Sequence, residues 1–218
     1  MLVKYFCIFI LFSLLTGCTT FMSASYSSKV DPDYYFSRND YLLVTYDNKA
    51  NPLESKYYIG QVVEGLKRRG FSSVYSYKNK EDSPQPFKGI LFVSVNKKSS
   101  SYEYDSANYG MVDSGKSTTN CTGYGYSVNC TENKQKTYGV TGHSTKTGYL
   151  TGYYFSLDWY DIKTEERVLN IFSSSYEKRC SDDKLYSFIV NETMSRIDFN
   201  KPNKYEYKVK MPKNYTCK

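Results

Sequence analysis

Few residues of this sequence have the types and spacing that enzyme chemistry requires. His143 is the only His, and it lies among Gly, Ser and Thr in a stretch that predicts an exposed polar loop. Asp158 and Asp161 are three residues apart on an expected strand, so their side chains point to opposite faces and form no paired carboxylate site. We expect both to shape the hairpin that follows. No nucleophile elbow, phosphate-binding loop, zinc-protease motif or dinucleotide fingerprint is present. We therefore expect no enzyme, and a hydrolase with a dispersed site is an alternative.

Cys18 is the residue whose chemistry the sequence specifies most closely. Lys4 is the only charge in the first seventeen residues, and an apolar run follows it as far as Leu15. A short positive start and an apolar run are typical of a secretory signal peptide, and the run is shorter than the roughly 20 residues that span a bilayer. The run ends in Leu15-Thr16-Gly17-Cys18, which resembles the lipobox of bacterial lipoproteins.

The lipobox resemblance implies an anchor and a location. Residues 1–17 would be the signal peptide, cleaved before Cys18, whose thiol would carry a diacylglycerol and whose new amino group would carry a further acyl chain such as palmitate. Two or three chains, at about 0.8 kcal/mol per buried CH₂, hold a protein durably on a membrane. Thr19 replaces the Asp that favours inner-membrane retention in enteric bacteria, so the resemblance implies the outer membrane, facing the periplasm.

The remaining Cys residues agree with an exported protein. After Cys7 leaves with the signal peptide and Cys18 is lipidated, an even number remains, which in an oxidising compartment predicts two disulfides. Three pairings are open. We prefer a short-loop pair and a pair that ties down the C-terminal tail: Cys121–Cys130 and Cys180–Cys217. Without a C-x₂-C motif and with one His, we expect no metal site and no cofactor.

The charge pattern argues against a nucleic-acid partner. The formal net charge is +7, but the charges are scattered and form no block of like sign. A solvated surface explains such a pattern in an exported protein. The expected partners are the membrane, through the lipid, and an envelope protein or glycan.

Hydrophobic periodicity predicts five strands and two helices. The first helix begins at Asn51-Pro52, with Asn51 as its cap, and ends in a basic turn before Gly70. The second helix is opened by Ser181 and ended by Pro202. The expected strands are residues 40–46, 71–77, 89–95, 153–162 and 167–175.

This order, β-α-β-β-(insertion)-β-β-α, predicts an α+β fold with a mainly antiparallel sheet and two helices on one face. We expect a single domain over residues 40–200, with a Gly/Tyr-rich insertion at about 97–152 that forms a stapled hairpin or a mobile segment. Residues 18–39 would be a tether, and residues 201–218 would be a tail tied by a disulfide and containing an edge strand.

The arrangement resembles a family of small periplasmic lipoproteins of Gram-negative bacteria that is known only as a domain of unknown function. The shared parts are the lipobox at Cys18, the Gly70-Phe71 pair after a helix, and segments 90–95, 123–126 and 157–164. Glu165 departs from the pattern, which has Gly there. The family assigns no catalytic residue. The resemblance implies a lipid-anchored envelope protein with a scaffold, assembly or interaction role. The 25 Tyr residues leave a polysaccharide- or cell-wall-binding module as an alternative.

Overall fold

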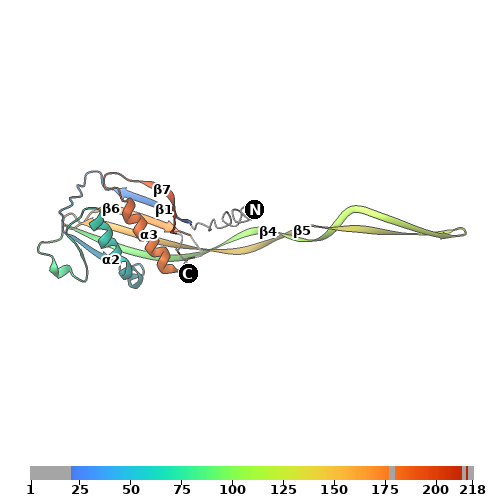
Figure 1. Cartoon of the computed structure of the whole chain (residues 1–218), viewed down its shortest axis with the longest axis horizontal. Coiled ribbons are helices and arrows are strands. Elements are labelled where there is room, and N and C mark those ends of the chain that lie inside the picture. Colours follow the sequence, from blue (N-terminus) through green and yellow to red (C-terminus); the bar gives the residue numbers. More distant parts are fainter. Residues whose placement is uncertain (1–20, 177–179, 213–214, 216–218) are drawn as a thin grey trace, which may run out of the picture. The chain divides into compact units, whose positions relative to one another are not determined.

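The computed structural model describes residues 21–176, 180–212 and 215. These residues form a mixed α+β structure, with one seven-stranded sheet and two helices (Figure 1). The α+β class is therefore confirmed. The strand order is β3-β2-β4-β5-β6-β1-β7. The strands are β1 (Phe21–Val30), β2 (Leu42–Tyr46), β3 (Val74–Ser76), β4 (Gly89–Tyr124), β5 (Ser127–Asp161), β6 (Arg167–Ser175) and β7 (Lys204–Lys210).

The sheet contains both kinds of strand pairing. Strand β2 pairs in parallel with β3 on one side and with β4 on the other. Antiparallel pairing joins β5 to β6, β6 to β1, and β1 to β7. Helices α2 (Pro52–Arg68) and α3 (Asp182–Arg196) contact each other and pack on the same face of the sheet (Figure 1). A short 3₁₀ helix, η1 (Lys80–Asp82), follows β3.

The chain divides into two compact units, residues 100–150 and the remainder. The first of these is a hairpin formed by the distal parts of β4 and β5, joined at Gly125-Tyr126. A two-residue turn with Gly first, here with a φ of 66°, is the arrangement of type II′ hairpin turns. The insertion expected at about 97–152 thus consists of regular strands.

Strand β1 corrects the expectation of a tether over residues 18–39. Residues 21–30 lie between β6 and β7, with Met22, Ala24 and Tyr26 buried and the intervening Ser residues on the other face. That alternation is the period of a half-buried strand, and the Ser-rich composition concealed it. Residues 18–20 lie outside the described residues.

The expected strand order lacked β1. The edge strand that we expected within residues 201–218 is present as β7, which lies at one end of the strand order and pairs with β1. Tail residue Cys217 lies outside the described residues.

The helices occur where the sequence predicted them, and their apolar stripes are buried. Ile59, Val62 and Leu66 of α2 face the core, and Gly70 takes a φ of 93° after the helix. The expected Asn51 side-chain cap does not form. Instead, the Asn51 carbonyl accepts hydrogen bonds from the Ser55 amide and hydroxyl, at 3.1 and 2.9 Å.

The core between sheet and helices centres on Trp159, which is fully buried. The rings of Phe36 and Phe71 meet it edge-on, with centroids 5.1 and 5.5 Å away. The Arg38 guanidinium lies over the rings of Phe71 and Phe199, at 4.2 and 4.6 Å. This cluster joins β5 to the segments before β2 and after both helices.

Candidate interaction surfaces

The structure describes three of the five Cys residues to which we assigned a role. Cys121 and Cys130 form a disulfide, with their Cα atoms 4.0 Å apart, and this is the short-loop pairing that we preferred. Cys180 is also disulfide-bonded. Its pairing with Cys217, and the lipidation of Cys18, remain predictions because Cys18 and Cys217 lie outside the described residues.

The structure does not bring the acid–base candidates together. His143 is exposed on β5, not in a loop, and its ring forms no hydrogen bond within the described part of the chain. Asp158 accepts hydrogen bonds from Arg167 (3.1 Å) and Asn170 (2.8 Å) on β6. Among the residues described, no group of three or more His, Cys, Asp or Glu side chains could hold a metal ion.

Asp161 is buried and organises the turn between β5 and β6. Its Oδ1 accepts hydrogen bonds from the amides of Lys163 (2.8 Å) and Thr164 (3.0 Å). Burial alone would raise the pKa of this carboxyl, but the hydrogen bonds outweigh burial and hold the pKa below its ordinary value. The two Asp residues therefore serve the hairpin, as their spacing indicated.

One face of the sheet has no described helix on it. Along β4, β5 and β6 the buried residues alternate with partly exposed ones, which point away from α2 and α3. Several of the latter are aromatic: the rings of Phe92 and Tyr160 lie 5.8 Å apart, and those of Tyr154 and Phe172 lie 5.7 Å apart. An antiparallel sheet commonly leaves one face to water, but polar residues then dominate that face. The aromatic pairs mark it as a candidate contact surface.

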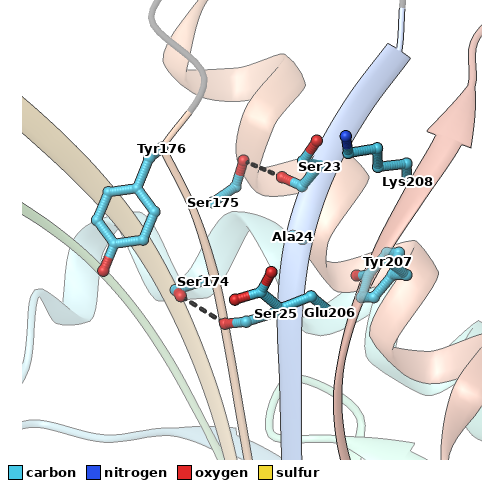
Figure 2. Close-up of a pocket in the computed structure, with 9 residues that line it drawn as sticks. All are labelled: Ser23, Ala24, Ser25, Ser174, Ser175, Tyr176, Glu206, Tyr207 and Lys208. Atoms are coloured by element: carbon cyan, nitrogen blue, oxygen red, sulfur yellow. Dashed lines mark hydrogen bonds between the residues drawn. The ribbon is translucent and has the colours of Figure 1, made fainter.

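A groove of about 580 Å³ crosses β6, β1 and β7 (Figure 2). Its floor contains hydroxyl groups: Ser25 Oγ and Ser174 Oγ are 2.7 Å apart, and Ser175 Oγ donates to the Ser23 carbonyl at 2.8 Å. The sequence did not predict this groove, because residues 21–30, which form β1 and line part of it, were expected to belong to a tether. The alternation of Ser with Met, Ala and Tyr in residues 22–27 was the signal that could have revealed β1.

A second hollow, of about 380 Å³, lies over β4, β5 and β6. Tyr154 and Phe172 line it, and the Tyr154 hydroxyl is 3.4 Å from that of Tyr176, which lines the groove. That hydrogen bond, and then burial, raise the pKa of Tyr154. The hydrogen bond between Tyr154 and Tyr176 therefore joins the lining of one hollow to the lining of the other.

The groove and the hollow offer rings, hydroxyls and charged side chains. Glu206 and Lys208 line the groove, and Lys98 lines the second hollow. The only His of the chain, His143, belongs to the hairpin unit. The lining therefore offers hydrogen-bond donors and acceptors to a polar segment or ligand.

Helix α3 is tied to β4 and β5 through one carboxylate. Asp182 accepts hydrogen bonds from Lys97 (2.8 Å) and from the Tyr153 hydroxyl (2.6 Å). Burial opposes ionisation of Asp182, yet these hydrogen bonds lower its pKa. The hydrogen bond to Asp182 raises the pKa of Lys97. Burial, and after it the hydrogen bond to Asp182, raise the pKa of the Tyr153 hydroxyl. Tyr153 is thus a buried structural residue, and its ring is not available to a partner.

The hairpin unit has no core. None of residues 100–150 is buried, and Tyr124 and Tyr126 at its turn are fully exposed. A two-stranded hairpin alone is marginally stable in water, and the Cys121–Cys130 disulfide near the turn adds a covalent constraint. Nearly every side chain of residues 100–150 is therefore accessible to a partner.

The faces of the hairpin differ in character. A Cβ on Gly110 would meet Thr141, and one on Gly139 would meet Val112, so these four residues share one face. Their neighbours therefore share the opposite face, because strand side chains alternate. These neighbours are all exposed, namely Tyr109, Met111, Tyr138 and Val140, and we call them the apolar patch. The rings of Tyr109 and Tyr138 stack within it, with centroids 6.2 Å apart.

No helix in the described ranges is long and apolar enough to cross a bilayer.

Comparisons with known proteins leave the family open. No family model matches the chain, and no curated protein matches it. Among solved structures, the chain is similar to the PelC dodecamer from Paraburkholderia phytofirmans, at 11% identity and a TM-score of 0.43, over 79% of this chain and 95% of that one. A PDZ domain protein from Parabacteroides distasonis is similar at 10% identity and a TM-score of 0.40, over 91% of this chain and 41% of that one. Similarity at this level carries no conclusion about function.

Proposed function

We propose that this chain is a non-enzymatic, lipid-anchored protein of the cell envelope that acts in assembly through its hairpin unit. The observation that carries the contact role is the hairpin itself. Its residues 100–150 form regular strands and bury no side chain, and the apolar patch is exposed on one face. Exposed apolar side chains that cluster on a folded surface mark interaction sites.

The anchor is supported by the lipobox-like Leu15-Thr16-Gly17-Cys18. Metabolic labelling with a palmitate analogue in the native host tests it. Wild type should be labelled and processed, whereas Cys18→Ala should be unlabelled and accumulate as precursor. Cys7→Ala is the matched control and should behave like wild type. Labelling that persists in Cys18→Ala would refute the anchor.

The contact role is tested by capture from crosslinked envelopes. The hairpin variant replaces the apolar patch with Ser at all four positions. The control variant replaces four exposed apolar residues outside the hairpin unit with Ser: Tyr35, Leu53, Tyr57 and Ile162. A protein captured with wild type and control but lost with the hairpin variant supports the proposal. Equal capture with all three, or no capture with wild type, contradicts it.

A glycan-binding role is the second candidate, and the exposed rings at the turn favour it. Tyr124 and Tyr126 present their full faces to solvent, as a sugar-stacking site requires. Binding of cell-wall or surface polysaccharide should then fall at least tenfold in Tyr124→Ala/Tyr126→Ala. Binding that survives this change would exclude these rings as the site.

A further inference from the structure

The hairpin unit has two strand edges with no described partner. Strand β4 pairs with β2 only over Gly89–Val93, and β5 pairs with β6 only over Tyr153–Tyr160. Between these limits, within the described residues, each strand is paired with the other alone. The outer N–H and C=O groups of such edges are a template for another strand.

Of the usual protections of an edge, proline is missing here, and charged side chains are present but balanced in sign. Proline, which blocks strand addition, is absent from residues 100–150, and the unit carries four Lys against four acidic residues. A unit with no net charge does not repel a copy of itself. These edges therefore permit another strand to pair with them. The exposed apolar patch would be partly buried by such pairing, which favours association.

The two edges carry opposite charge. The hairpin part of β4 has three acidic residues and one basic residue: Glu103, Asp105, Asp113 and Lys116. The hairpin part of β5 has three basic residues and one acidic residue: Lys134, Lys136, Lys146 and Glu132. All eight side chains are exposed. One edge is therefore net negative and the other is net positive by the same amount.

Within one chain these charges already meet across the strand pair. Lys134 Nζ lies 3.7 Å from Asp113 Oδ2. If two hairpins pointed the same way, with β5 of one chain beside β4 of the other, these strands would again run antiparallel and would bring basic side chains next to acidic ones. Opposite charges across a strand pair stabilise it, and like charges destabilise it.

We propose that the partner of the hairpin is a second copy of this chain, with the basic β5 edge of one hairpin against the acidic β4 edge of the next. This inference rests on the proposed contact role of the hairpin and names its partner. The contact uses two different edges, so every added copy leaves one edge of each kind free. Heterologous contacts of this type build rings or filaments instead of closed dimers. The apolar patches would then lie side by side on one face.

A charge-swap experiment on the full chain, purified in mild detergent, tests this contact by sedimentation velocity. The β5-reversed variant carries Lys134→Glu, Lys136→Glu and Lys146→Glu, so both edges become negative. The β4-reversed variant carries Glu103→Lys, Asp105→Lys and Asp113→Lys, so both edges become positive. The matched control reverses three exposed Lys residues outside the hairpin unit: Lys49→Glu, Lys78→Glu and Lys163→Glu.

Wild type and control should sediment as assemblies of several chains, and each reversed variant alone should be at least tenfold weaker in association. An equal mixture of the two reversed variants should recover assembly, because a positive hairpin then meets a negative one. Recovery also shows that both variant hairpins are folded. A monomeric wild type, unchanged assembly in either reversed variant, or a mixture that stays monomeric would overturn the proposal. A monomeric wild type whose hairpin is still required for capture of a different protein would overturn self-association and leave the contact role standing.

Discussion

Asp161 shows how a single buried carboxylate fixes the turn between β5 and β6. Its Oδ1 accepts two backbone amides, and its pKa is lowered because those hydrogen bonds outweigh the effect of burial. The folded protein therefore keeps this carboxylate charged to a lower pH than the unfolded chain does. The resulting stabilisation is complete above the unfolded pKa of about 4 and is lost as the pH falls through the lower folded pKa.

We expect Asp161→Asn to lower the free energy of unfolding by about 1–2 kcal/mol at pH 7, because a charged acceptor is replaced by a neutral one. The difference from wild type should shrink as the pH falls toward 3. Denaturant unfolding across this pH range measures it. Asp47→Asn is the control, since Asp47 Oδ1 accepts one amide, that of Lys49, at a half-exposed site. If Asp161→Asn lowers the free energy of unfolding by the same amount at every pH, the stabilisation does not depend on the ionisation of Asp161.

Glu165 occupies a backbone position that suits Gly. Its φ is 61°, in the left-handed region. Left-handed backbone costs residues with a Cβ about 1–2 kcal/mol. Glu165→Gly should therefore raise the free energy of unfolding by about 1 kcal/mol. Glu166→Gly, one residue further, should not stabilise the protein. If both changes have the same sign, backbone strain is not the cause.

At the scale of the elements, β4 depends on a close approach to the core Trp. A Cβ added to Gly89 would clash with Trp159 Nε1, whereas one added to Gly60 on α2 would meet nothing within 4 Å. Gly89→Ala should thus destabilise the protein by about 1–3 kcal/mol through overpacking. Gly60→Ala should stabilise it by about 0.5–1 kcal/mol through helix propensity. Thermal unfolding of both variants tests this, and a neutral Gly89→Ala would show that Trp159 can move.

The helices could be predicted from the sequence because their signals are local. Pro52 at the first turn, the buried stripe through Ile59 and Leu66, and Gly70 after the end all act within α2 itself. Strand β1 could not be recognised in the same way, because its partners β6 and β7 lie about 140 to 190 residues further along the chain. Pairing over such a separation leaves no local signal except alternation.

At the scale of the whole molecule, the sequence predicted the insertion and the Cys121–Cys130 disulfide, but it did not indicate the groove on the sheet. That groove combines residues of β1, β6 and β7, which come together only in the folded sheet. The opposite charges of the two hairpin edges were present in the sequence. Only the structure shows that these charges lie on the two paired strands of a hairpin without a core.

Separate segments of the chain have separate tasks in the proposed function. Cys18 is expected to carry the anchor, the seven-stranded sheet with α2 and α3 supplies the body, and the hairpin unit is proposed to make the contacts. Among the described residues, every buried one belongs to the body, and residues 100–150 contain none. Changes in the hairpin should therefore alter association and leave the unfolding of the body unchanged.

Site-specific photocrosslinking in intact cells of the native host tests the central claim, that the hairpin is the contact surface. A photoreactive amino acid replaces Tyr109 or Tyr138 in the apolar patch, and Tyr57, equally exposed on α2, serves as the control. We predict crosslinks to a second polypeptide from Tyr109 and Tyr138, and none from Tyr57. Crosslinks from Tyr57 alone, or from no position, would contradict the account.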